Sequence, residues 1–538
     1  MAVNFRSYLD DLREADELVD VHKPTDIRHI AALVDKSPKS LIFHDVKGYS
    51  MPVVSGLTND RNRIAIAMKC DYSETEGRLR HALDNPIDPV MTGSGSEREV
   101  FVRDEEVDLF KLPVPLCSVL DGGPMITAGV VLAQDSEYGM NVGCYRFQIK
   151  ERNLTGIDIV TPNNLRRYAE RALSRDEPLP ISINIGAHPI EMIASLYKAP
   201  LGTNELGIAG GLHGEAVQIA PCETIDVPCI AESEIVLEAE ILPTGWTKPE
   251  GRFGEFTRLM GGVHWNPYVR VKAVSRRKDA LYYALHMPWE NIWLKEHGFQ
   301  AMLRRVLKEA GVQATAINVT PGGCCHWHAV IGIKPHPGDG KNTLLAALSI
   351  GDMKHVVVVD DDIDVFDSMD VEWAIATRVQ ADRDVMILSN ARSKPLDPSL
   401  PPVPGRIPTT AKCGIDATIP ADVPRERYHR ISYAYADQVK LEDYLAPHSP
   451  GSGGATNGGV EASDEKIAEL AVQIRNLIEK KPMYFAELAE FFSGDGFPAV
   501  SRAMGELHRG GGIWQDSEGR HCLKDSPFAA TPPARAKS

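Results

Sequence analysis

The pattern of hydrophobic and polar positions divides the chain into stretches of different character. Up to about residue 110, a helical pattern over residues 5–18 alternates with short apolar strands, such as residues 40–43. Between residues 112 and 285, apolar segments of strand length are separated by Gly, Pro and Asn. The strands are predicted at residues 129–133, 181–185, 215–219, 234–242 and 268–273. Many strands at short spacing favour a β-barrel or a β-sandwich.

From about residue 290 the pattern alternates between helix and strand. Residues 292–310 have helical periodicity and are followed by Gly311, a typical stop signal. Further strands are predicted at residues 314–319, 328–333 and 355–359, and further helices at residues 342–348 and 370–377. Such alternation favours an α/β unit. The expected fold class is therefore α+β, with a β-rich body followed by an α/β domain.

The C-terminal part differs from both. Residues 447–463 contain seven Pro or Gly and no aromatic residue, a composition typical of a flexible linker. Beyond it, three helices are predicted at residues 464–480, 484–492 and 497–509, and a hairpin at residues 513–523. This order is typical of a winged helix, a fold that often binds DNA. Residues 464–524 carry ten acidic and eight basic side chains, which favours a protein-contact module instead.

Charge and composition narrow the class of protein. The 538 residues carry 58 Lys and Arg against 74 Asp and Glu, a net charge of -16, which argues against general affinity for nucleic acid or an anionic membrane. The N-terminal pattern predicts no secretory signal, and apolar runs shorter than about 18 residues predict no membrane-spanning helix. The nine cysteines have irregular spacing without a disulfide framework. We therefore expect a cytoplasmic protein with reduced thiols.

The first candidate for chemistry is Arg146 in the segment NVGCYR, residues 141–146. An arginine among apolar neighbours needs a partner, because an unpaired buried charge is costly. One interpretation is a structural salt bridge. The other is a guanidinium that binds a carboxylate or phosphate through two hydrogen bonds. The segment alone leaves both interpretations open.

The second candidate is the segment PEGRFGEF, residues 249–256, in which Glu250 and Glu255 flank two glycines. The glycines interrupt any regular helix face and let the backbone turn tightly toward a ligand. Two carboxylates brought to one dry site raise the pKa of one of them. A carboxylic acid with a raised pKa is a proton donor near neutral pH. The alternative is a solvated loop with two surface glutamates.

Three further segments contain metal-ligating residue types. In LGTNELG, residues 201–207, Glu205 and its neighbours offer oxygens to Mg²⁺ or Mn²⁺, although a turn is the simpler interpretation. The alternating Cys and His of CCHWH, residues 324–328, would share one face of a predicted strand, but they lack a fourth zinc ligand. The acidic run at residues 360–364 follows a predicted strand. It is either a cation site or a solvated turn that opens the next helix.

Together these segments resemble the UbiD family of reversible decarboxylases over residues 5–445. The motifs that carry the resemblance are LPVP (112–115), DGG (121–123), NVGCYR (141–146), EIVLE (234–238), EGRFGE (250–255), DDIDV (361–365) and WA (373–374). PLGTNELG, residues 200–207, and the segment 378–398 are most similar to the branch that acts on hydroxylated benzoic acids.

The resemblance implies a prenylated flavin mononucleotide in a split β-barrel, with Mn²⁺ or Mg²⁺ and K⁺ at its phosphate. By matching position, the family's catalytic Glu–Arg–Glu network falls on Arg146, Glu250 and Glu255. The implied cofactor-binding residues are Asn141, Cys144, Tyr145, Arg146, Asn163, Ser195, Glu205 and Lys412. The implied metal ligands are Asn141, Asn164 and Glu205. Asn164 is a departure, because the family usually has a histidine there and an amide oxygen is a weaker ligand than a carboxylate.

The resemblance also implies a chemistry. The flavin would supply the electron sink that side chains lack. Arg146 would orient the substrate carboxylate, Glu255 would donate the proton that replaces carbon dioxide, and Glu250 would hold Arg146. The loop at residues 286–291 matches no family pattern and is expected to set specificity.

The expected substrates are hydroxybenzoates such as protocatechuate or 4-hydroxybenzoate. An aryl-coenzyme A thioester such as phthaloyl-CoA is the alternative, and a flavin reductase on a split barrel is the alternative of another class. The expected partners are a flavin prenyltransferase, which supplies the cofactor, and further copies of the chain in a homodimer or homohexamer. Nucleic acid and membranes are not expected partners.

The expected domain organisation combines the pattern and the resemblance. It comprises an N-terminal α/β segment (1–110), a split β-barrel flavin-binding domain (111–290), a linker helix (291–312), an α/β oligomerisation domain (313–446), a flexible linker (447–463), a winged-helix-like module (464–524) and a disordered tail (525–538).

Overall fold

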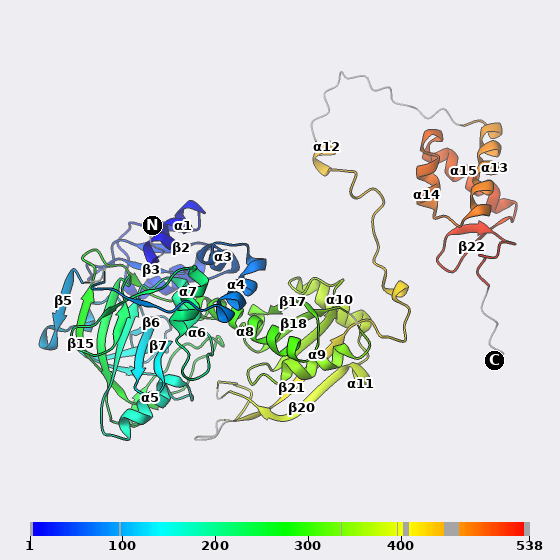
Figure 1. Cartoon of the computed structure of the whole chain (residues 1–538). Coiled ribbons are helices and arrows are strands. Elements are labelled where there is room, and N and C mark those ends of the chain that lie inside the picture. The colour runs from blue at the N-terminus through cyan, green and yellow to red at the C-terminus, as the bar shows by residue number, and fades with distance from the viewer. Residues whose placement is uncertain are drawn as a thin grey trace, which may run out of the picture. The chain divides into compact units, whose positions relative to one another are not determined.

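The computed structural model describes residues 4–95, 98–334, 336–394, 396–401, 408–445 and 462–531. The chain forms two compact units, Met1–Arg425 and Glu426–Ser538. Figure 1 labels many of the helices and strands of both units. The described part of the chain contains no helix that is long and apolar enough to cross a membrane.

The first unit begins with a layer of helices and short strands. Its elements are α1 (Phe5–Glu14), β1 (Leu18–Val21), α2 (Ile30–Lys36), β2 (Ser40–Phe43), β3 (Val53–Ser55), α3 (Arg61–Met68) and α4 (Tyr72–Asp84). Strands β1, β2 and β3 form one sheet with β16 (Tyr282–Tyr283). The helix predicted over residues 5–18 is shorter, because the chain turns at Asp16, with φ 58°, and then enters β1. Asn4 caps α1, which buries its apolar face.

A closed antiparallel barrel forms the centre of the first unit. Its strands are β6 (Met125–Asp135), β7 (Gly139–Glu151), β8 (Leu154–Ile157), β9 (Leu179–Ile185), β12 (Ile235–Ile241) and β15 (Tyr268–Arg276). They pair in the order β12-β9-β6-β7-β8-β15, and pairing of β15 with β12 closes the ring. The helices α5 (Asn164–Leu173), α6 (Pro189–Leu196) and α7 (Glu205–His213) pack against these strands. The barrel predicted from the sequence is confirmed.

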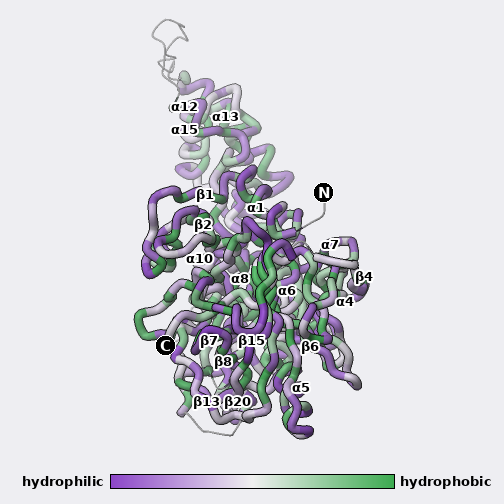
Figure 2. Tube along the Cα trace, turned by 90° about the vertical axis from the view of Figure 1, so that its left-hand side faces the viewer, coloured by the Kyte–Doolittle hydropathy of each residue, from purple (hydrophilic) through white to green (hydrophobic). Residues whose placement is uncertain are grey.

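Smaller strands lie beside the barrel. They are β4 (Val90–Met91), β5 (Val100–Arg103), β10 (Gln218–Pro221), β11 (Pro228–Ile230), β13 (Lys248–Glu250) and β14 (His264–Asn266). β5 pairs with β15 on the barrel, whereas β10 pairs with β4 and β11 in a separate sheet. The strand predicted at residues 215–219 therefore belongs to this small sheet and not to the barrel. Figure 2 shows a strongly hydrophobic stretch at the label of α6. All residues of α6 except the last, Leu196, are buried.

The long helix α8 (Trp289–Glu309) connects the barrel to a second sheet within the first unit (Figure 1). This sheet has the order β17-β18-β19-β21-β20. Its strands are β17 (Ala314–Val319), β18 (His328–Ile333), β19 (His355–Asp360), β20 (Val385–Arg392) and β21 (Thr409–Ala417), with the helices α9 (Asp339–Leu348), α10 (Ser368–Arg378) and α11 (Ala381–Asp384). Because β18, β19 and β21 are parallel, the predicted α/β unit is confirmed.

Two possible metal sites take other structural roles. At the acidic run after β19, Arg378 pairs with Asp360 at 3.1 Å and with Asp362 at 2.6 Å, so the carboxylates stabilise a buried arginine. The strand predicted through CCHWH is wrong before residue 328. Cys324 and Cys325 have φ values of 62° and 47° in a turn after the 3-10 helix Pro321–Gly323. The side chains of Cys324, His326 and His328 therefore do not share a strand face.

The second unit contains the predicted helices and hairpin. They are α13 (Asp464–Lys480), α14 (Phe485–Phe491), α15 (Phe497–Arg509), β22 (Ile513–Gln515) and β23 (His521–Leu523), preceded by α12 (Leu441–Leu445). The helices enclose a small apolar core of their own. The predicted linker, residues 447–463, lies outside the described residues except for Ala462 and Ser463. Of the predicted disordered tail, residues 525–531 are described, and Ala530 exchanges hydrogen bonds with the hairpin, so this part is ordered.

Candidate functional site

Arg146 is the centre of a charged network on the barrel. It projects from β7, whereas Glu250 ends β13 and Glu255 follows in the next loop. Arg146 Nε and Nη2 donate to the two oxygens of Glu250 at 3.1 and 3.0 Å, and Nη1 donates to Glu255 Oε1 at 2.6 Å. Arg146 Nη2 also pairs with Asp158 Oδ2 at 2.8 Å. The structure thus brings the three residues predicted to be catalytic to one place.

The loop that carries Glu255 is held by the DGG segment at residues 121–123. Asp121 Oδ1 accepts a hydrogen bond from Gly254 N at 3.0 Å, and Gly122 N donates to the carbonyl oxygen of Arg252 at 2.9 Å. A Cβ atom on Gly122 would lie 2.0 Å from the carbonyl oxygen of Gly251, so a side chain there would displace the loop. Two motifs far apart in the sequence therefore form one local structure around Glu255.

One arginine faces three carboxylates in this network. Burial raises the pKa of Glu250 above its usual value, although Arg146 opposes the rise. Burial also acts on Asp158, but Arg146 and then His264 outweigh it and hold the pKa of this carboxyl below its usual range. His264 Nδ1 lies 3.2 Å from Asp158 Oδ2, and this hydrogen bond raises the pKa of His264. The raised carboxyl pKa that the sequence predicts for the glutamate pair thus falls on Glu250.

His264→Gln is expected to reduce stability more at pH 6 than at pH 8.5. A histidine whose pKa is raised by folding stabilises the protein below its unfolded pKa of about 6.5, and this contribution is lost as the pH rises through the folded value. The expected loss at pH 6 is about 1 kcal/mol, the usual size for one hydrogen-bonded pair. Thermal unfolding at both pH values measures it, with the exposed His336→Gln as control. Equal losses at the two pH values would contradict a charged His264–Asp158 pair.

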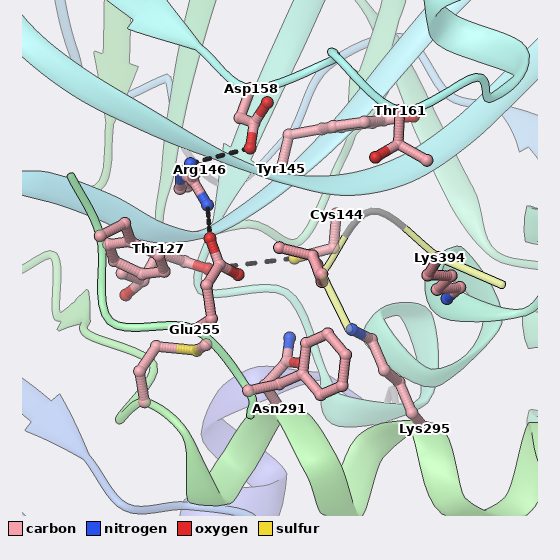
Figure 3. A pocket seen from close by; sticks show the side chains of 14 residues that line it. Thr127, Cys144, Tyr145, Arg146, Asp158, Thr161, Glu255, Asn291, Lys295 and Lys394 are labelled. Carbon is pink, nitrogen blue, oxygen red and sulfur yellow. Dashed lines mark hydrogen bonds and ion pairs between the residues drawn. The ribbon is translucent and has the colours of Figure 1, made fainter. Parts of the chain in front are cut away.

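A cavity of about 250 Å³ opens against the network (Figure 3). The residues that line it are Thr127, Cys144, Tyr145, Arg146, Asp158, Thr161, Phe253, Glu255, Phe256, Met287, Asn291, Lys295, Lys394 and Leu396. In Figure 3, Arg146 and Glu255 lie on one side of the cavity, and Lys295 and Lys394 lie on another. Met287 and Asn291 come from the loop that the sequence analysis expects to set specificity.

Asn141 and Glu205, two of the predicted metal ligands, are buried side by side. Asn141 Nδ2 and Val142 N donate to the two oxygens of Glu205 at 3.1 and 2.7 Å. Asn141 Oδ1 is buried and has no hydrogen-bond partner among the residues described. Burial raises the pKa of Glu205 to about 7. A carboxylate and an orphaned amide oxygen in one buried place are a donor set that suits a hard cation.

The remaining residues predicted to bind the metal or the cofactor have separate contacts. The third predicted metal ligand, Asn164, directs Nδ2 at the carbonyl oxygen of Ala199 at 3.5 Å. Asn163 caps α5 and accepts a hydrogen bond from the Tyr145 hydroxyl at 3.4 Å. Cys144 and Tyr145 both line the cavity. Ser195 is buried in α6, where its hydroxyl donates to the carbonyl oxygen of Met192.

Lys412 is not among the residues that line the cavity. It lies buried on β21, where Nζ donates to the carbonyl oxygens of Leu348 and Ile350 at 2.7 and 2.6 Å. The cavity instead contains Lys295 from α8 and Lys394 from the segment after β20. Neither lysine was predicted from the sequence.

Of the three charged site residues that were not predicted, only Lys394 lies in a sequence segment that could have indicated it. Lys394 lies in SKPLDP, within a segment that carries the family resemblance, so its basic side chain offered a signal. Lys295 is one of several charged residues on an amphipathic helix, and Asp158 is a single carboxylate after an apolar strand. Neither pattern distinguishes a cavity residue from a surface residue.

Three family models match consecutive parts of the first unit. They describe the N-terminal domain (residues 9–83), the Rift-related domain (residues 90–288) and the C-terminal domain (residues 296–417) of 3-octaprenyl-4-hydroxybenzoate carboxy-lyase, UbiD. The Rift-related match contains all six barrel strands and the Arg146 network.

Curated proteins and solved structures agree with these matches. The chain is 34% identical over 432 residues to anhydromevalonate phosphate decarboxylase of Methanothermobacter thermautotrophicus, covering 79% of this chain and 99% of that protein. It is 31% identical over 436 residues to gallate decarboxylase of Lactiplantibacillus plantarum, covering 73% and 86%.

The structure of the UbiD-class enzyme HmfF from Pelotomaculum thermopropionicum in complex with FMN superimposes with a TM-score of 0.78 at 38% identity, covering 82% of this chain and 100% of that one. An evolved dimeric form of HmfF, solved in complex with prFMN, superimposes with a TM-score of 0.75 at 36% identity, covering 82% and 100%. The chain therefore belongs to the UbiD family of carboxy-lyases.

Proposed function

We propose that the protein catalyses the reversible, non-oxidative decarboxylation of an aromatic carboxylic acid with the help of prenylated FMN. The observation that carries the proposal is Arg146, held between Glu250 and Glu255 at the wall of a cavity. The HmfF complexes with FMN and prFMN support the choice of cofactor.

The donor chemistry of the site suits such a cofactor. A flavin phosphate is an anion, which a divalent cation held by the protein can neutralise. The buried pair of Asn141 and Glu205 suits the divalent cation, Mn²⁺ or Mg²⁺, that would bind the phosphate, and K⁺ is proposed beside it. Tyr145 and Cys144 would line the flavin. Burial raises the pKa of Cys144 to about 12, so its thiol stays protonated and takes no nucleophilic role.

The side chains of the network have separate roles. Loss of carbon dioxide leaves an electron pair that side chains cannot delocalise, and prenylated flavin, when bound, would supply the sink for it. Glu255 donates the proton that replaces carbon dioxide, because it lines the cavity and its Oε1 is fixed by Arg146 at 2.6 Å. Glu250 is almost fully buried and binds Arg146 through both oxygens, so it positions the arginine.

Arg146 has a limited capacity to bind substrate. Its Nε and Nη2 are engaged with Glu250 and Asp158, and one direction of Nη1 is engaged with Glu255. The two interpretations left open by the sequence therefore combine. Most of the guanidinium orders the carboxylates, and the remaining Nη1 direction is the one that would orient the substrate carboxylate.

Glu205→Gln is expected to weaken Mn²⁺ binding by at least about tenfold, since it removes the only charged ligand that we propose. The measurement is the metal content and the Mn²⁺ titration of the full-length protein. Glu215→Gln, an exposed glutamate beyond the end of the same helix, is the matched control. If Glu205→Gln and Glu215→Gln bind Mn²⁺ as the wild type does, the metal site is elsewhere.

The substrate is tested with a panel of acids. Protocatechuate, 4-hydroxybenzoate and gallate represent the hydroxybenzoate class, which the gallate decarboxylase relative supports. Phthaloyl-CoA represents the thioester alternative. The protein, coexpressed with a flavin prenyltransferase as the supplier of the cofactor, is expected to release carbon dioxide from an aromatic acid. Carbon dioxide release from none of the panel, in protein that contains the prenylated flavin, would overturn the hydroxybenzoate class and the phthaloyl-CoA alternative.

Assembly is proposed as a homodimer or homohexamer, and the evolved dimeric HmfF supports a self-associating family. Sedimentation of the full-length protein measures it, and a monomer at micromolar concentration would exclude both assemblies.

A further inference from the structure

The wall of the cavity away from Arg146 contains an unbalanced positive charge. Lys295 projects from α8 into the cavity (Figure 3). Its ammonium group lies 4.9 Å from the centre of the Phe256 ring. Within the described ranges, no carboxylate forms an ion pair with Lys295, and Glu255 acts on it only from a longer distance. Lys295 is therefore a partly buried cation whose ammonium group lies against an aromatic face.

Lys394 and Lys198 share one carboxylate. Lys394 Nζ lies 3.1 Å from Asp352 Oδ1, and Lys198 Nζ contacts Asp352 Oδ2. Lys394 Nζ also lies 2.6 Å from His326 Nε2, which is the acceptor because a lysine ammonium can only donate. The proton of neutral His326 is then on Nδ1, a buried donor without a partner among the residues described. Donors and positive charges thus exceed acceptors around these lysines.

This excess is costly unless an anion balances it. Burial lowers the pKa of Lys198 to about 6, so Asp352 mainly balances Lys394, and Lys295 is the charge left without a contacting carboxylate among the residues described. Burial, and then repulsion from Lys394, lowers the pKa of Lys295 to about 8, and burial lowers the pKa of Lys394 to about 8 as well. Both lysines remain mostly charged at pH 7. They are therefore available for charge-assisted hydrogen bonds to an anion.

We propose that Lys295 and Lys394 form a subsite for a second anionic group of the substrate, a carboxylate or a phosphate monoester. The subsite faces the cavity from the side away from Arg146 and Glu255, so it would bind a group remote from the carboxylate that is lost. This inference rests on the proposed function and narrows its substrate class to acids with two anionic groups. The two lysines could bind any anion, and the phosphate of a bound flavin is the alternative to an anionic group of the substrate.

The binding experiment uses the full-length holoprotein with benzoate, isophthalate and terephthalate, three ring acids that differ in the second carboxylate. Isothermal titration is expected to show that at least one dicarboxylate binds about 10- to 100-fold more tightly than benzoate. Lys295→Met is expected to remove this preference while it leaves benzoate affinity within about threefold. Lys272→Met, which removes a lysine paired with Glu240 on the barrel, is the control and is expected to keep the preference.

A second measurement separates the two sources of anion. FMN and riboflavin are titrated into flavin-free wild-type protein and Lys295→Met. An equal affinity of both proteins for FMN supports a substrate subsite. A loss of FMN affinity of tenfold or more, with riboflavin unaffected, would assign the lysines to the flavin phosphate and overturn the proposal. Lys295→Met is expected to fold at least as stably as the wild type, because it removes an uncompensated buried charge.

The binding test of the subsite does not depend on whether the protein turns over any acid. If the dicarboxylate preference depends on Lys295 but no acid releases carbon dioxide, the subsite stands and the proposed reaction fails. If neither dicarboxylate binds more tightly than benzoate, the subsite is overturned, whether or not the protein decarboxylates benzoic acids.

Discussion

Glu255→Gln is expected to lower the rate of carbon dioxide release by about 10²- to 10⁴-fold, the usual contribution of a positioned general acid. The amide oxygen of glutamine can still accept the 2.6 Å hydrogen bond from Arg146 Nη1, so the network and the cavity are retained. What is lost is the acidic proton. The measurement is the turnover of the cofactor-loaded enzyme with its best acid, together with the affinity for that acid, which is expected to change little.

The control for this variant is Glu177→Gln, which alters an exposed glutamate paired with Arg175. It is expected to keep full turnover. Full turnover of Glu255→Gln would show that the proton comes from another group, and Glu250, whose pKa is raised by burial, would be the next residue to test.

Arg146→Met is expected to abolish turnover and to destabilise the protein by about 3–5 kcal/mol, the usual cost of removing one partner of a buried ion pair. The variant leaves Asp158, Glu250 and Glu255 close together without their shared cation. Arg146→Lys keeps the charge but cannot bind both oxygens of Glu250 at once, so an intermediate loss is expected. Urea unfolding measures the change in stability.

The double variant Arg146→Met with Glu250→Gln separates electrostatics from packing. It removes one of the stranded carboxylates and is expected to recover part of the lost stability. Arg270→Met, an exposed arginine on β15, is the control and is expected to unfold as the wild type does. A loss below about 1 kcal/mol for Arg146→Met would contradict a buried network that depends on this arginine.

Much of the fold follows from local pattern. The strands β17 and β18 and the helices α13 and α15 have the predicted bounds, because their apolar periodicity agrees with nearby Gly, Pro and Ser. The first helix is shorter than predicted, since Asp16 adopts a positive φ that the hydrophobic pattern does not show. The turn at Cys324 has the same cause.

The site was predictable where motifs are local and unpredictable where it depends on distant contacts. Arg146, Glu250 and Glu255 lie in distinctive segments, and the structure brings them together. Asp158 joins them only because β8 ends beside β7, and Lys295 reaches the cavity only because α8 turns that face toward the barrel. Lys412 faces two carbonyl oxygens instead of the cavity, a direction that a match of sequence position cannot show.

The most direct test of the proposed reaction is the identity of the flavin that the protein retains. Full-length protein coexpressed with a flavin prenyltransferase is purified, and the released cofactor is examined by absorption and mass spectrometry alongside turnover of the best acid. We expect the mass of prenylated FMN, and turnover only in protein that contains it. Turnover by protein that contains plain FMN, or no flavin, would contradict a prenylated-flavin decarboxylase built on Arg146, Glu250 and Glu255.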